Sequence, residues 1–201
     1  MSALAPLRYE LEVAVRLSIP DNTAFTALTA LRLLGYPELE RVQRETIYSL
    51  QLIDSGRPAE EIVAALTRAE VLFNPNKHEL SYRLLNAPGG APVVRERSAL
   101  RPSSEARTQP EYEAVVSDNG DDCSRLVALL KDHFGIRELR SLSRATAWTL
   151  CESGACASAE RLGWACAQLL CNSHSQRVLI RQAPRRSAVG EPPPPAANES
   201  R

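Results

Sequence analysis

Residues 39–52, LERVQRETIYSLQL, decide the fold, because a second version of the stretch, LRSLSRATAWTLCE, begins at residue 139. The positions that match in residue type at an offset of 100 are Gly35/Gly135, Leu39/Leu139, Arg44/Arg144, Thr46/Thr146, Tyr48/Trp148 and Leu50/Leu150. Farther along, the agreement resumes at an offset of 98, where Asn74 aligns with Asn172. The chain therefore contains a repeat, and overlooking a repeat would misassign the whole fold.

Each copy is predicted to contain a strand, a helix, a long strand, a helix and a strand. Strict alternation predicts the strands, and apolar stripes at helical spacing predict the helices. In the first copy these elements are expected over 9–17, 24–34, 39–52, 58–73 and 79–84. If the long strand bends near 44–46 into two, the copy becomes a ferredoxin-like βαββαβ unit, an α+β fold with helices on one face of the sheet.

The domain organisation follows from this repeat. The sequence predicts a first unit over 1–86, an exposed linker rich in Pro and Gly over 87–110, a second unit over 111–183 and a disordered Pro-rich tail over 184–201. A domain of this size buries only about 60% of its unfolded surface, so the two units are expected to share a core as a pseudo-dimer. The residues expected inside that body are Leu11, Val13, Leu50, Leu66, Leu150 and Ile180.

Composition restricts the function classes. The 24 basic and 24 acidic residues give a net charge of zero, which argues against a nucleic-acid binder that needs a basic stripe. No apolar run approaches the length of a membrane span, and the N-terminus lacks a signal-peptide pattern. The five cysteines contain no CxxC pair and are interpreted as small apolar residues. A cytoplasmic protein without a membrane partner is expected.

The sequence offers no catalytic or metal-binding motif, so no catalytic residue, metal ligand or cofactor is predicted. Arg44 and Arg144 occupy matching strand positions and could form a paired site for a carboxylate or phosphate. The alternative is that each is an outward-facing strand arginine paired with a local glutamate such as Glu45.

The loops after the second helix of each copy are the other candidates. Asn74 to His78 and Cys171 to His174 carry the residues that end a helix, and capping explains them. The functional alternative is a loop that contacts a partner in both copies. The candidate residues for partner or anion contact are therefore Arg44, Arg144, Asn74, Asn76, Lys77, His78, Asn172 and His174.

The first copy resembles the small PurS subunit of phosphoribosylformylglycinamidine synthase. The resemblance rests on YELEVAVRL, the helix ending in LLGY, the strand ERVQRETIYSLQL and the passage ALTRAEVLFNPNKHELSYRL. It covers residues 9–85, and residues 111–181 more weakly. Where the long strand of that family usually carries Gly-Lys-Tyr, this chain has Glu45, Thr46 and Ile47. No role of that lysine is carried over to this chain.

The resemblance implies a non-catalytic subunit that joins the glutaminase and synthetase subunits, so that ammonia from glutamine reaches the activated substrate in purine biosynthesis. ATP would bind the synthetase subunit. PurS forms dimers, so a tandem chain would be a covalent version of that dimer, with further self-association possible. The competing interpretation is a regulatory protein similar to ACT domains, with a small metabolite between two ferredoxin-like units.

Overall fold

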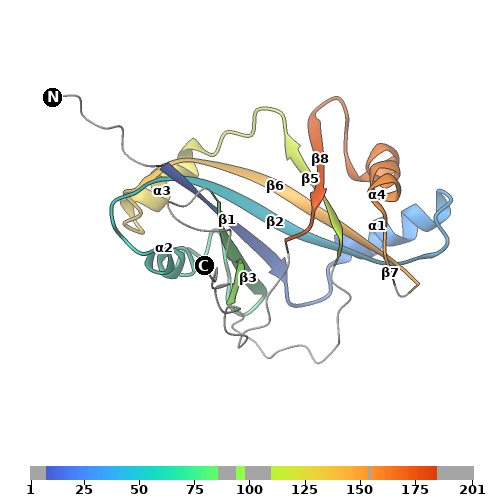
Figure 1. Cartoon of the computed structure of the whole chain (residues 1–201), viewed down its shortest axis with the longest axis horizontal. Coiled ribbons are helices and arrows are strands. Elements are labelled where there is room, and N and C mark those ends of the chain that lie inside the picture. The colour runs from blue at the N-terminus through green and yellow to red at the C-terminus, as the bar shows by residue number, and fades with distance from the viewer. Residues whose placement is uncertain (1–7, 86–93, 98–109, 154, 185–201) are drawn as a thin grey trace, which may run out of the picture.

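A computed structural model of the chain describes residues 8–85, 94–97, 110–153 and 155–184. The predicted tail, apart from Pro184, and most of the predicted linker lie outside these residues. The protein has an α+β fold in which one mixed-length antiparallel sheet carries helices (Figure 1). The strands are β1 (Arg8–Leu17), β2 (Leu39–Ile53), β3 (His78–Leu85), β4 (Val94–Arg97), β5 (Tyr112–Asp118), β6 (Leu139–Glu152), β7 (Ala155–Cys156) and β8 (Gln176–Gln182). The helices are α1 (Asn22–Leu33), α2 (Ala59–Leu66), α3 (Ser124–Asp132), α4 (Ala159–Ala165) and the π-helical turn η1 (Cys166–Leu170).

The two long strands β2 and β6 lie side by side at the centre of the sheet, whose order is β4-β3-β1-β2-β6-β5-β8 with β7 beside β6 (Figure 1). They pair antiparallel, with Thr46 opposite Thr146, Arg44 opposite Trp148 and Tyr48 opposite Arg144. Because these partners also match at the repeat offset, a pseudo-twofold axis passes through the threonine pair. Neither long strand breaks into two, since the neighbouring copy supplies each with a full-length partner.

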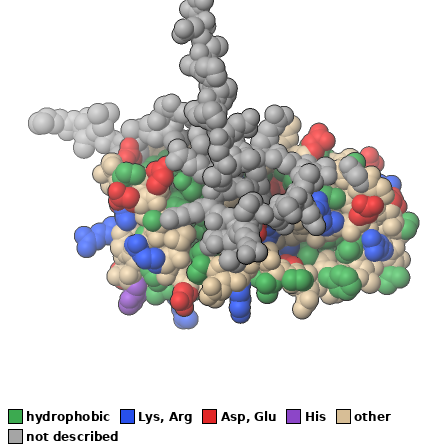
Figure 2. Space-filling view, turned by 90° about the horizontal axis from the view of Figure 1, so that it is seen from below, with side chains coloured by type: hydrophobic (Ala, Val, Ile, Leu, Met, Phe, Trp, Pro, Cys, Tyr) green, Lys and Arg blue, Asp and Glu red, His purple; other side chains and the backbone are tan. Residues whose placement is uncertain are grey.

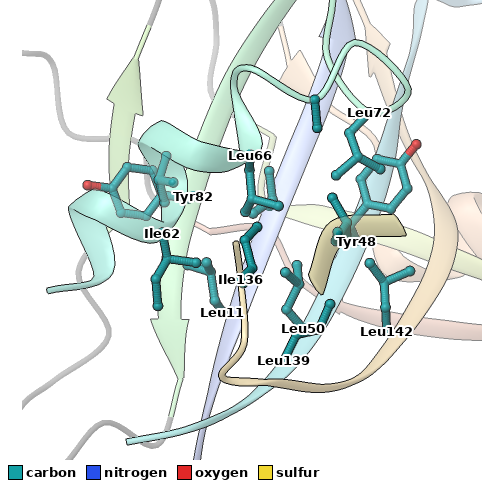
Figure 3. Close-up of a cluster of buried hydrophobic side chains, with 14 of the residues drawn as sticks. Leu11, Tyr48, Leu50, Ile62, Leu66, Leu72, Tyr82, Ile136, Leu139 and Leu142 are labelled. Atoms are coloured by element: carbon teal, nitrogen blue, oxygen red, sulfur yellow. The ribbon is translucent and has the colours of Figure 1, made fainter. Parts of the chain in front are cut away.

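The helices form two pairs, each made from both copies. α2 and α3 lie at one end of the long strands, and α1 and α4 lie at the other (Figure 1). Under α2 and α3, Ile136, Leu139 and Leu142 of the second copy pack among Leu50 and other side chains of the first (Figure 3). Under α1 and α4, the core combines residues of α1 and the start of β2 with residues of β5, β6 and α4.

The residues expected in the interior are placed as follows. Leu11, Val13, Leu50, Leu66 and Leu150 are buried, whereas Ile180 is only partly buried and packs at the margin of the second core. Ile180 lies on β8, which forms an edge of the sheet. An edge strand has a neighbour on one side only, which explains why its side chains are less covered.

Two elements differ from the prediction. The helix expected over 58–73 ends at Leu66, and the chain continues through short turns in which the Ala69 N–H donates to the Leu66 carbonyl and the Leu72 N–H to the Ala69 carbonyl. These turns still bury Leu72 and Phe73. The predicted linker is not structureless throughout, because β4 pairs with the edge of β3. An edge strand presents unpaired backbone groups that a passing segment can satisfy.

Candidate functional site

Arg44 and Arg144 form two equivalent ion pairs instead of one shared site. The Arg44 guanidinium bonds the carboxylate of Asp21 through Nε at 3.0 Å and Nη2 at 3.4 Å. Arg144 bonds Asp121 at 3.2 and 3.4 Å, and both residues match the first pair at the repeat offset of 100. Each pair links the start of a first helix to the middle of a long strand. The first pair also includes the Asp21 side chain as the cap of α1, since it accepts from the N–H of Thr23.

The expectation that these arginines pair with a local glutamate is wrong, because their partners are Asp21 and Asp121, whereas the expected exposure holds for Arg144. Arg44 lies on the face of the sheet that carries the helices, with its guanidinium carbon 5.9 Å from the centre of the Trp148 ring. Glu45, on the opposite face, lies 3.7 Å from the guanidinium of Arg16. Side chains alternate between the faces of a strand, so neighbours such as Arg44 and Glu45 cannot share a face.

The two arginines are also too far apart to bind one small anion together while they are paired with Asp21 and Asp121. Arg144 sits opposite Tyr48, four residues along β2 from Arg44. This spacing puts their Cα atoms roughly 14 Å apart. Each guanidinium turns toward its own aspartate instead of toward the other arginine. The described geometry therefore provides two structural ion pairs placed symmetrically about the centre of the sheet.

The loop from Asn74 to His78 is closed by its own hydrogen bonds. The Asn74 N–H donates to Nδ1 of His78 at 3.0 Å, and the Asn76 N–H donates to the side chain of Asn74 at 2.9 Å. The backbone carbonyl of Lys77 accepts from Ser18, which ties the loop to the end of β1. These contacts are those that the capping interpretation expects. They leave the side chains of Asn76 and Lys77 exposed.

The second copy closes the equivalent loop in the same way, with a different acceptor. The Asn172 N–H donates to Oε1 of Gln176 at 2.8 Å, and the His174 N–H donates to the Asn172 side chain at 3.1 Å. Gln176 thus replaces His78 as the acceptor. Both Asn172 and His174 are exposed. The pseudo-twofold axis relates the two loops. They therefore lie at opposite edges of the sheet, and each has the same orientation relative to the face that carries the helices.

This exchange of acceptors predicts a pH effect. The pKa of His78 lies below its usual 6.5, because burial, and then the charge of Lys77, disfavours the protonated ring. A group whose folded pKa is lowered in this way loses stability as the pH falls through 6.5, where the unfolded chain takes up the proton first. We therefore expect the loss of stability between pH 7.5 and 5.5 to be smaller in His78→Gln than in the original chain. Urea unfolding of both proteins at the two pH values measures this.

The second copy supplies the matched control. Gln176→His should introduce an acid-dependent loss of stability at the equivalent loop, while the other imidazoles are the same in all three proteins. Identical pH slopes for the original chain and His78→Gln would contradict this expectation, because they would show that His78 binds protons equally in the folded and unfolded states.

The sequence prediction missed a cluster of charges on the face of the sheet without helices. Glu12 of β1 and Glu113 of β5 are the two buried charged residues of the described chain. The Arg181 guanidinium bonds both, at 2.9 Å to Glu12 and 2.6 Å to Glu113. Arg83 lies 2.8 Å from Glu12. Burial raises the pKa of Glu113, and the Arg181 charge opposes that rise.

This cluster shows that the sheet is strongly curled. Three strands, β2, β6 and β5, separate β1 from β8. In a flat sheet the two would lie roughly 19 Å apart, beyond the reach of a glutamate and an arginine side chain. Their direct contact means that the face without helices is concave, with Ile47 and Ala147 buried on it. Alternation alone identifies this face as the polar one and gives no sign of the curl.

A second group missed from sequence joins the copies at the end of α1. Tyr36 donates its hydroxyl hydrogen bond to Glu152 of β6, and burial, with this bond, raises the pKa of the tyrosine. The Arg161 guanidinium lies over the Tyr36 ring at 5.0 Å, and it bonds Glu38 at 2.8 Å. All of these contacts connect the first copy with the second. They fix the relative position of the copies and offer no nucleophile beside a base.

Neither the remaining surface of the described residues nor the comparison with known proteins indicates a particular ligand or activity. On the face in Figure 2, acidic and basic side chains alternate at both ends, without a large area of one sign among the described residues. Those residues hold no cluster of three or more metal-ligating side chains. None of the described helices is long and apolar enough to cross a membrane.

No model of a known protein family matches the chain, and no curated protein matches it significantly.

Proposed function

We propose that this chain is a non-catalytic bridging subunit of a glutamine-dependent phosphoribosylformylglycinamidine synthase, acting in the cytoplasm in purine biosynthesis. It would hold a glutaminase subunit against a synthetase subunit, which binds the ATP. The resemblance of residues 9–85 to PurS motivates this proposal. In this proposal the chain is a tandem of two PurS-like units.

The observation that supports it most is the pairing of β2 with β6 about Thr46 and Thr146. It joins two similar units into one body through their long strands, as a covalent dimer requires. The two shared cores make that body resistant to relative motion of the copies. A bridging subunit needs this property, because ammonia transfer between two enzymes depends on a fixed distance between their sites.

The metabolite-binding alternative gains no support from the arginines at the centre of the sheet. Arg44 and Arg144 are each held by a carboxylate of the same copy. A bound anion would have to displace Asp21 or Asp121, and it would lose the charge-assisted hydrogen bonds already present.

Reconstitution with the cognate glutaminase and synthetase subunits tests the proposal. We expect no turnover by the purified chain alone and glutamine-dependent formation of formylglycinamidine ribonucleotide by the three proteins together. Without this chain, glutamine-supported activity should be lost and ammonia-supported activity should largely persist. Unchanged glutamine-dependent activity in its absence would refute the proposal and favour the metabolite-binding alternative.

A charge reversal locates the contact. Lys77→Glu changes an exposed side chain whose loop is closed by backbone and asparagine contacts, so folding should be unaffected. We expect it to weaken association with the partner subunits by about tenfold, as the loss of a charge pair at an interface does. Arg140→Glu is the matched control, since Arg140 is exposed at the other end of the long strands. Equal affinities of the two variants would exclude the loop as the contact.

A further inference from the structure

The two edges of the sheet, formed by β4 and β8, are not equivalent. At one end, β4 pairs with residues Leu80 to Arg83 of β3. At the repeat offset of 98, these correspond to Val178 to Arg181 of β8. Among the described strands, none pairs with the outer side of β8. The segment that receives an extra strand in the first copy is therefore the one that no described strand covers in the second.

The side chains of this edge are exposed although they are apolar. Val178 is 44% exposed and Leu179 is 59% exposed, whereas Leu80, the counterpart of Val178, is 3% exposed. Long uncovered edges with apolar side chains are templates for pairing with another strand, and folded proteins usually protect them. Here β8 carries such side chains at its centre.

The backbone of β8 has hydrogen-bonding groups available on the outer side. The Asn119 N–H donates to the Ser175 carbonyl, and the Ala183 N–H donates to the Glu111 carbonyl. In an antiparallel pair, alternate residues bond to the same neighbour. The odd-numbered residues of β8 thus face β5, and the N–H and C=O groups of Val178 and Ile180 point away from the sheet.

The sequence of β8, QRVLIRQ, reads almost the same in both directions. If two copies pair antiparallel with Leu179 on a twofold axis, Val178 of each faces Ile180 of the other, and Gln176 faces Gln182. The two Val–Ile pairs exchange four backbone hydrogen bonds, and the two leucines meet as a close, non-bonded pair. A twofold interface requires such self-complementarity.

This arrangement brings two pairs of arginines together. Arg177 of one copy would face Arg181 of the other. Arg181 is already bonded to two carboxylates, Glu12 and Glu113, so the repulsion between the guanidinium groups is reduced. Salt should reduce it further, because exposed charges are screened. Pairing through β8 is therefore expected to tighten when the salt concentration is raised.

We infer that a second copy of this chain docks on β8, in antiparallel register centred on Leu179, and extends the sheet across a twofold axis. This inference is independent of the proposed bridging role. It assigns the outer edge of β8 to self-association, and it leaves the loop at Lys77 free for other proteins.

Sedimentation of the full chain over a concentration series tests the inference. The original chain should form dimers, and Leu179→Lys should raise the dissociation constant at least about tenfold, because two lysines would face each other across the axis. The control is Leu33→Lys, which changes a leucine that is 85% exposed on α1 and should leave the dimer intact. A chain that stays monomeric, or a dimer that persists in Leu179→Lys, would overturn the inference.

Cysteine substitution tests the register. Leu179→Cys should form an intermolecular disulfide in the oxidised protein, since the non-bonded pair brings the Cα atoms to about 4.5 Å. Arg177→Cys should not, because its two Cα atoms would be roughly 14 Å apart. Mass spectrometry of the cross-linked peptide separates these bonds from those of the five native cysteines. Equal cross-linking at both positions, or a dimer that appears only after residues 184–201 are removed, would contradict the proposed pairing.

Discussion

A fragment of residues 1–88 will not form a stable monomer. Its core would lose Leu130, Ile136 and Leu139, which are fully buried in the intact chain and belong to the second copy. β2 would also lose β6, one of its two neighbours in the sheet, along nearly its whole length. Removing buried leucine-sized side chains costs about 2–5 kcal/mol each, so the loss of three is comparable to the entire stability expected of a domain.

The fragment can recover these contacts only by finding another chain. We expect it to aggregate or to form a homodimer, in which Tyr36, Leu39 and Val42 of a second fragment replace the residues at the matching positions. Mixing it with residues 111–183 should restore a heterodimer with one cooperative unfolding transition. Circular dichroism and sedimentation measure these outcomes. A fragment that is monomeric at micromolar concentration and unfolds cooperatively would show that the copies are independent domains.

Sequence patterns predicted the elements better than their partners. Alternation located β1, β2 and β3 to within about two residues, and local residue types explain the ends of α1, which is capped by Asp21 and followed by Gly35. Gly35 has a φ of 112°, in the region that favours glycine after a helix. These features depend on neighbours in the chain, which is why a local pattern reveals them.

The exchange of core residues between the copies could not be read from such patterns. Leu142 alternates as a strand residue should, but the pattern does not say whether it packs under a helix of its own copy or of the other. Pairing β2 with β6 moves it into the core of the first copy. For the same reason, Glu12 reads as a residue of a polar, solvent-facing side, and only the curl of the whole sheet buries it.

In the candidate site, too, sequence patterns reveal contacts between near neighbours in the chain more readily than contacts between distant residues. The roles of Asn74 and Asn172 in closing their loops follow from spacing alone, because their partners lie within four residues. The pairing of Arg44 with Asp21 involves a separation of 23 residues. The signal for it was present in the repeat, since aspartates at 21 and 121 match at the same offset as the arginines.

The charge cluster on the concave face leads to the other large expected effect. Glu12 is the anion that faces both Arg83, from one end of the sheet, and Arg181, from the other. Its replacement by Gln leaves Arg83 without this carboxylate and Arg181 with Glu113 alone. Leaving a buried charge uncompensated costs several kcal/mol, so we expect Glu12→Gln to lower the free energy of unfolding by about 3–5 kcal/mol. Urea unfolding at pH 7 measures the loss.

Glu10→Gln is the matched control, because Glu10 lies on the same face of β1 and its exposed carboxylate bonds only the Gln51 side chain among the contacts described. Its effect should stay within about 0.5 kcal/mol. Adding Arg83→Gln to Glu12→Gln should restore part of the lost stability, since the second change removes a guanidinium that no longer faces an anion. If Glu12→Gln and Glu10→Gln are equally stable, or if the double variant loses the sum of the single effects, the cluster does not hold the two ends of the sheet together.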